Sequence, residues 1–146
     1  MTKQQLKDYC DAEFENIDAV VYELFLVVQP DKTGYTTAEL AAIATFIHNF
    51  YNGVENILKR ISSYRQMETK VSPTWHKDLL KASSEARIIS DESYLVLSNY
   101  LSFRHFFIHA YSFILRWEEL KPLVDELGNT LSQFKKEVYG SMDLFI

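Results

Sequence analysis

The spacing of apolar side chains limits this chain to helices along almost its whole length. Apolar residues recur at steps of four and three between residues 43 and 61, and again between residues 120 and 138. The first set is Ile43, Ile47, Phe50, Val54, Ile57 and Ile61, and the second is Leu120, Val124, Leu127, Leu131, Phe134 and Val138. An α-helix turns once every 3.6 residues, so each set forms one apolar stripe. The sequence therefore predicts an all-α protein.

The first half of the chain predicts two long helices. A stripe of the same kind covers residues 6–28, and the Pro- and Gly-containing segment 29–34 predicts a turn after it. Thr36 followed by Glu39 is the pattern of a capping box, so the second helix is expected to begin there. Gly53 lies inside this second helix, where it costs about 1 kcal/mol relative to alanine. Its position predicts a close contact with another helix.

The second half predicts three more helices. Residues 62–74 have the composition of a loop, and a shorter helix is expected from about Trp75 to Ile89. Ser90 or Asp91 is expected to cap the next helix, because their side-chain oxygens accept hydrogen bonds from free backbone N–H groups. That helix is expected to end at roughly Tyr111–Leu115.

The last helix carries the second stripe, with Pro122 expected in its first turn, where proline is tolerated. Short connections favour antiparallel neighbours. We therefore expect residues 1–146 to form one domain, an up-down bundle of about five helices.

Composition supports a folded helical domain and narrows its setting. The chain is 47% hydrophobic and contains 4 Gly and 3 Pro, which argues against disorder and against a turn-rich β-sandwich. A single cysteine, Cys10, excludes an internal disulfide and a cysteine-based zinc site. The first residues have no apolar core of the kind a signal peptide needs, and no stretch approaches 18 apolar residues. We therefore expect a cytoplasmic protein with no membrane segment.

Charge is distributed unevenly. The formal net charge is -5, but residues 56–87 carry +4, whereas residues 1–55 carry -6 and residues 88–146 carry -3. The overall acidity argues against broad coating of nucleic acid. The basic middle is either an ordinary solvated face or a local surface for anions.

The sequence contains no signature of a cofactor or of a resident metal. Gly-rich phosphate loops, His-Glu-x-x-His helices and Glu-x-x-His pairs are all absent. His105 and His109 are spaced to share a metal, but no nearby carboxylates complete such a site, so we expect none. His48 and His76 are interpreted as structural or surface residues.

The most informative segment is the aromatic stretch of residues 103–111. On an ideal helix Arg104, His105, His109 and Tyr111 occupy one arc of about 160°. Arg104 also lies on the apolar stripe predicted for this helix, formed by Tyr94, Leu97, Leu101, Ile108 and Leu115. A buried arginine needs an anionic or hydrogen-bonding partner. Arg104 is therefore either paired with a carboxylate or presented at an interface or cleft.

Here the chain resembles a known family. Arg104-x4-His109-x-Tyr111 matches the Arg-x4-His-x-Tyr motif of HEPN-domain proteins, and the sequence is similar to the HepT toxins of the prokaryotic HepT/MntA toxin–antitoxin systems. The similarity extends over three segments, Phe50–Ile57, Trp75–Leu80 and Tyr100–Val124. At Ile108 the chain departs from the family, which often has a basic residue there, so one contact with substrate phosphate is expected to be missing.

The resemblance implies a metal-independent RNA endonuclease that acts on tRNA or mRNA as a homodimer, with a composite active site at the dimer interface. In this interpretation Arg104 and His109 are catalytic. A histidine exchanges protons near neutral pH and an arginine grips phosphate oxygens as charge builds up. His105 would orient the phosphate.

The resemblance also implies a partner. In these systems an MntA-like nucleotidyltransferase antitoxin attaches AMP to the motif tyrosine, here Tyr111, which would fill the cleft and repel RNA. For Tyr111 the alternative is a buried aromatic residue with a hydrogen-bonded hydroxyl. For the whole chain the alternative is a non-catalytic helical partner of a nucleotidyltransferase.

Overall fold

The computed structural model describes residues 1–67, 71–109 and 114–144, and these residues form five α-helices and no strand. The helices are α1 (Lys3–Val27), α2 (Thr37–Tyr64), α3 (Trp75–Glu85), α4 (Asp91–His109) and α5 (Trp117–Asp143). The predicted all-α fold of about five helices is therefore confirmed. Within the described ranges, no helix combines the length and the apolar character needed to cross a membrane.

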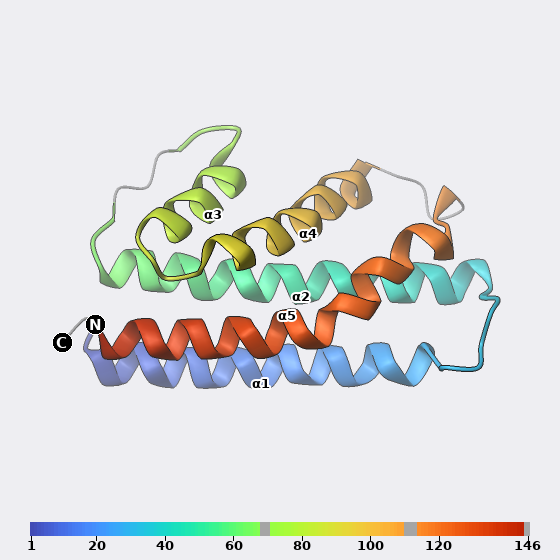
Figure 1. Ribbon diagram of the computed structural model, residues 1–146, viewed down its shortest axis with the longest axis horizontal. Coiled ribbons are helices and arrows are strands. Elements are labelled where there is room, and N and C mark those ends of the chain that lie inside the picture. Colours follow the sequence, from blue (N-terminus) through green and yellow to red (C-terminus); the bar gives the residue numbers. More distant parts are fainter. Residues whose placement is uncertain (68–70, 110–113, 145–146) are drawn as a thin grey trace.

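Helix α2 is the centre of the molecule. It packs against each of the other four helices. Figure 1 shows α1, α2 and the second half of α5 running side by side, with α3 and α4 together on another side of α2. The predicted apolar stripes lie in the core: all six residues of the α2 stripe and all six of the α5 stripe are buried. These two stripes hold the bundle together mainly by removing apolar surface from water.

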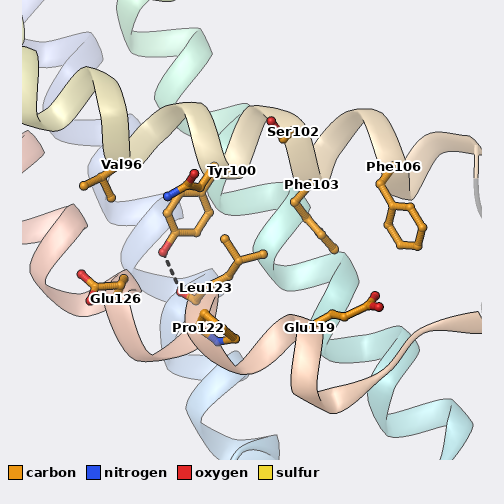
Figure 2. Close-up of a pocket in the computed structure, with 10 residues that line it drawn as sticks. Val96, Tyr100, Ser102, Phe103, Phe106, Glu119, Pro122, Leu123 and Glu126 are labelled. Carbon is orange, nitrogen blue, oxygen red and sulfur yellow. Dashed lines mark hydrogen bonds between the residues drawn. The ribbon is translucent and has the colours of Figure 1, made fainter.

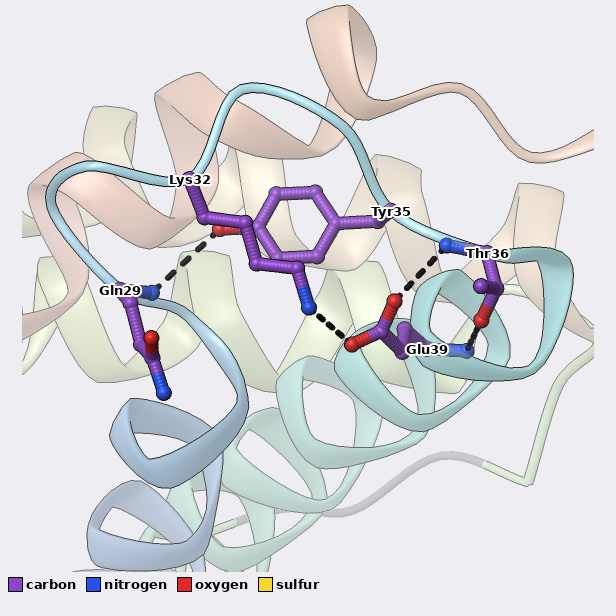
Figure 3. Close-up of polar contacts among 5 residues, drawn as sticks. All are labelled: Gln29, Lys32, Tyr35, Thr36 and Glu39. Carbon is purple, nitrogen blue, oxygen red and sulfur yellow. Dashed lines mark hydrogen bonds and ion pairs between the residues drawn. The ribbon is translucent and has the colours of Figure 1, made fainter.

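The connection between α1 and α2 is fixed by the predicted capping box. The Thr36 hydroxyl accepts a hydrogen bond from the Glu39 backbone N–H at 3.1 Å, and the Glu39 carboxylate accepts from the Thr36 N–H at 2.9 Å (Figure 3). Lys32 pairs with the same carboxylate, and its hydrogen bond lowers the pKa of Glu39. Tyr35, between them, packs on Trp117 of α5 with ring centroids 4.7 Å apart.

The start of α4 is anchored to α5. Of the two residues expected to cap this helix, Ser90 does so: its hydroxyl accepts from the Ser93 N–H at 3.1 Å. Glu137 of α5 then accepts from the Ser90 N–H, the Ser90 hydroxyl and the Ser93 hydroxyl at 2.7–3.0 Å. One carboxylate thus joins the cap of α4 to the opposite helix.

The third helix is shorter than predicted. It ends at Glu85 rather than Ile89, because Arg87 adopts a left-handed backbone conformation with φ of 60°. This turn directs Ile88 and Ile89 into the core, where both are buried. The apolar pattern is correct for burial at these two residues, but it cannot show that the backbone leaves the helix before them.

Two other helix limits differ from the prediction. Helix α2 continues to Tyr64, so the expected loop of residues 62–74 begins later. Helix α5 begins at Trp117, which places Pro122 inside the helix and not in its first turn. Proline supplies no N–H for the helical ladder, and α5 changes direction part-way along (Figure 1). The Tyr100 hydroxyl of α4 donates a hydrogen bond to the backbone carbonyl of Leu123, the residue after Pro122, at 2.6 Å.

Gly53 marks the close contact of α2 with α1 that the sequence predicts. A Cβ at this position would lie 2.5 Å from Cγ1 of Ile17 and 2.8 Å from its Cδ1. Ile17 is itself buried. Glycine therefore lets the two helices approach closely at the level of Ile17.

Candidate active site

The motif residues lie at the C-terminal end of α4. Arg104 is half-buried, and His105 and His109 are exposed. The two imidazole rings approach edge to face, with centroids 5.0 Å apart. Tyr111 and its immediate neighbours, residues 110–113, lie outside the described residues, as does most of the predicted end of this helix. The structure therefore brings the two histidines together and places Arg104 on the inner side of the same helix end.

The buried face of α4 is turned by about one residue from the predicted one. The buried residues are Ser93, Leu97, Tyr100 and Phe103, whereas Ile108 of the predicted stripe is 49% exposed. Arg104 thus lies at the edge of the packing face and not at its centre. The cause is the composition of α4, which is apolar on most of its circumference, so spacing alone does not select one face.

The charge of Arg104 is not paired with a carboxylate among the described residues. Its Nε atom is buried without a hydrogen-bond partner, and no ion pair with a carboxylate is found for it among the described residues. Of the two predicted states of this arginine, the described residues favour presentation at an interface or cleft. A half-buried guanidinium with no neutralising carboxylate is suited to bind an anion.

The wall behind Arg104 is formed by α2. Burial and the positive charge of Arg104 lower the pKa of His48. The His48 ring packs against Phe107 of α4 with centroids 5.2 Å apart. Tyr51, one turn further along α2, is 1% exposed, and burial together with the Glu55 carboxylate raises its pKa, while Arg104 acts in the opposite direction. His48 and Tyr51 are therefore both electrostatic neighbours of Arg104.

A second polar pair connects α2 to α3. Glu55 is 3% exposed, and its two carboxylate oxygens lie 2.8 and 2.9 Å from Nδ1 of His76. The His76 ring stacks on Trp75 with centroids 3.6 Å apart. His76 is a structural residue in this arrangement, as interpreted from the sequence. The sequence analysis did not identify His48, Tyr51 and Glu55 as residues near the motif. The signal was present, because polar side chains at positions 48, 51 and 55 share one face of a helix.

Arg104 and His109 are separated on their common helix. Five residues correspond to about 7.5 Å along the helix axis and about 140° around it. Arg104 is half-buried, whereas His109 is exposed. This separation is unfavourable for a compact site within one chain.

A pocket lies between α4 and α5, and none of the motif residues lines it. Figure 2 shows Phe103 and Phe106 of α4 facing Pro122 and Leu123 of α5, with Glu119 at the edge. Its volume is about 650 Å³. Two glutamates border it, Glu119 and Glu126, so it is a poor site for phosphate. We therefore do not place a phosphate-binding site in this pocket.

Apolar side chains stand exposed beside the motif. Phe106 is 38% exposed, Ile108 49% and Ile114 43%. Four basic residues of the segment 56–87 lie elsewhere, Lys59 and Arg60 in α2 and Lys77 and Lys81 in α3, and Figure 1 shows α3 beside the N-terminal half of α4. The surroundings of the motif in one copy are therefore more apolar than basic. In the part of the chain that the structure describes, no cluster of three His, Cys, Asp or Glu residues could hold a metal ion.

Comparison with known proteins identifies the family. Searches of the curated proteins and of the solved structures found no match. A family model described as HepT-like protein matches residues 42–144. The matched segment begins within α2, continues to the end of α5 and includes the whole motif region. Because this match covers well over half of the sequence, the chain belongs to the HepT-like family.

Proposed function

We propose that this protein is a metal-independent RNA endonuclease, the toxin component of a toxin–antitoxin pair. Family membership supports a toxin-like HEPN protein. The observation that carries the proposal is the arrangement at the end of α4. A half-buried arginine with no ion-pair partner among the described residues shares this helix end with two exposed, adjacent histidines.

The chemistry follows from these residue types. RNA carries its own nucleophile, the 2′-hydroxyl next to the scissile phosphate. His109 would take the proton from this hydroxyl or return one to the leaving oxygen, a role typically worth about 10²–10⁴ in rate. Arg104 would stabilise the charge that develops on the phosphate oxygens. His105 would orient the phosphate, since its ring contacts that of His109.

Cleavage of total RNA in the presence of EDTA tests this proposal. We expect the wild-type protein to cleave RNA with EDTA present, and Arg104→Ala and His109→Ala each to lower the rate by at least about 100-fold. Lys136→Ala, which removes an exposed charge from α5, serves as the control and should cleave normally. Cleavage that is unaffected by either motif substitution would refute the catalytic assignment.

We also propose that the active site is composite and forms in a homodimer. The separation of Arg104 from His109 within one helix supports this arrangement. Mixing inactive Arg104→Ala protein with inactive His109→Ala protein should restore part of the activity, because one mixed site receives its arginine from one chain and its histidine from the other. If mixtures remain as inactive as their components after subunit exchange, the site is not shared.

Regulation would act at Tyr111, through AMP transferred by an MntA-like nucleotidyltransferase. Co-expression with such an enzyme should add the mass of one or more AMP groups to a peptide containing Tyr111, and should abolish RNA cleavage. Tyr111→Phe protein should remain unmodified. Modification confined to another peptide would contradict this assignment.

A non-catalytic role is the second candidate, and exposed Ile108 favours it. An apolar side chain in place of a basic one suits a protein contact better than a phosphate contact. Both functions predict a complex with a nucleotidyltransferase. Only the toxin function predicts growth arrest when this chain is expressed alone, so an expression test separates them.

A further inference from the structure

Three polar atoms without hydrogen-bond partners are concentrated where α2 meets α4. The described residues contain four buried side-chain polar atoms of this kind, and three are His48 Nδ1, the Tyr51 hydroxyl and Arg104 Nε. Positions 48 and 51 are neighbours on one face of α2, which packs directly on α4. Each such atom costs about 1–3 kcal/mol when buried alone. Their concentration in one place indicates a functional arrangement rather than three independent losses.

The packing of α4 on α2 brings these residues near one another, and the electrostatic effects agree with it. The charge of Arg104 acts on the pKa of His48 and also on that of Tyr51. The two residues lie on the same face of α2, one turn apart, so the guanidinium is near both of them. The His48 ring is held in place by Phe107, which belongs to the same turn of α4 as Arg104.

We propose that Tyr51 and His48 are positioning residues for Arg104: together they hold the inner edge of its guanidinium, so that the two terminal nitrogens face outward toward an RNA phosphate. This inference rests on the proposed nuclease function and deepens it. An arginine uses a planar fork of N–H donors. With Nε turned toward α2, the terminal pair stays free to grip two phosphate oxygens.

The Glu55–His76 pair completes this arrangement. The Glu55 carboxylate acts on the Tyr51 hydroxyl and raises its pKa, after the larger effect of burial. A carboxylate on one side of a hydroxyl attracts its hydrogen, which leaves the oxygen lone pairs available on the other side. In the proposed arrangement the Tyr51 oxygen accepts from the Nε–H of Arg104 when phosphate binds, since neither atom has a partner among the residues that the structure describes. His76 fixes Glu55 from α3, so three helices support the orientation of one guanidinium.

Two substitutions test this proposal while keeping the packing. Tyr51→Phe removes only the hydroxyl, and His48→Phe keeps an aromatic ring while removing both ring nitrogens. We expect each to lower kcat by about tenfold or more, because a small displacement of a transition-state contact is costly, and to leave KM for RNA within about twofold. In an Arg104→Ala background neither should lower the rate further. Additive losses in that background would mean a purely structural role and would overturn the proposal.

Nuclear magnetic resonance gives a readout that does not depend on cleavage. The ¹⁵Nε–¹Hε signal of Arg104 should exchange slowly with water in the wild-type protein. It should shift and exchange at least about tenfold faster in Tyr51→Phe and in His48→Phe. Tyr100→Phe is the matched control, because Tyr100 is equally buried but its hydroxyl bonds to Leu123. An Arg104 signal unchanged in both test variants would overturn the proposal.

The two arms distinguish failure of this inference from failure of the proposed function. If no sample cleaves RNA but the Arg104 signal responds as expected, the nuclease function is wrong, and the positioning of Arg104 by Tyr51 and His48 is supported. If RNA is cleaved and the signal does not respond, the positioning role is wrong and the nuclease function stands. Thermal unfolding of each variant shows whether it is folded. If one of the two substitutions prevents folding, the other still tests the proposal.

Discussion

At the scale of single residues, the molecule shows how a positive charge is kept available beside a helix core. Arg104 is half-buried on a predominantly apolar helix, its Nε atom is buried without a partner, and its charge acts on His48 and Tyr51 of α2. Burial disfavours a second positive charge beside it. The lowered pKa of His48 therefore favours its neutral form, which is the state compatible with a neighbouring guanidinium.

This relation predicts the titration of His48. Burial is the larger cause of its lowered pKa and the Arg104 charge is the second. Arg104→Gln should therefore raise the pKa of His48 while leaving it below the ordinary value of about 6.5. Titration of the imidazole signals by nuclear magnetic resonance measures this shift, with Lys136→Gln as the control. A pKa of His48 that is the same with and without Arg104 would contradict the proximity of these residues.

The Glu55–His76 pair predicts a strong effect on stability. His76→Ala leaves the Glu55 carboxylate buried without its partner, so we expect the free energy of unfolding to fall by about 3 kcal/mol. Adding Glu55→Gln to that variant should recover part of the loss, because an amide is less costly to bury than a charge. Urea unfolding of the single and double variants measures both effects. If the double variant is less stable than His76→Ala, and the second substitution costs as much free energy as the first, this account is refuted.

At the scale of helices, spacing and caps determine which faces meet. The α2 stripe is buried throughout, and its start is defined by Thr36 and Glu39. The sequence also indicates a position, Gly53, where α2 approaches another helix closely, because a glycine in a strongly helical pattern has a cost that close packing can compensate.

That contact predicts opposite effects for two glycine substitutions. Gly53→Ala places a methyl group 2.5 Å from Ile17, so we expect a loss of about 1–3 kcal/mol in stability. Gly128→Ala is the matched control: it also lies within a helix, but nothing stands within 4 Å of its added Cβ. It should gain about 0.5–1 kcal/mol from helix propensity. Thermal unfolding compares them, and equal effects of the same sign would contradict the close contact.

At the scale of the whole molecule, the uneven charge and the exposed apolar residues bear on whether two copies of the chain associate. One copy presents Phe106, Ile108 and Ile114 beside the motif, and the basic residues 56–87 lie toward the other half of α4. A net charge of -5 opposes RNA binding by a single copy. Association along α4 would cover the apolar residues, and whether it also places basic segments near the substrate depends on the geometry of the pair.

Assembly through this surface predicts a selective disruption. Ile108→Glu should convert a dimer to monomers and abolish RNA cleavage without changing helix content, because a buried unpaired carboxylate at an interface is costly. Leu144→Glu is the control, since Leu144 is more exposed and lies at the far end of α5. Sedimentation equilibrium and circular dichroism measure assembly and folding. Dimers that persist in Ile108→Glu would place the interface elsewhere.

Much of this protein follows from local physical rules that act along the sequence. The helical period, the capping box at Thr36 and the tight contact at Gly53 depend on neighbours within a few residues or on a single missing Cβ, and the structure agrees with each. The motif residues on α4 were also predicted as candidates from the sequence. Their catalytic roles remain a proposal.

The tertiary structure decided what spacing cannot encode. The left-handed Arg87 ends α3 early, and the start of α5 at Trp117 places Pro122 inside that helix. The apolar circumference of α4 left its buried face open, and packing on α2 selected the face that places Arg104 beside His48 and Tyr51. The Glu55–His76 pair joins residues 21 positions apart. Such contacts depend on how separate helices dock, because the energy that fixes them comes from groups far apart along the chain.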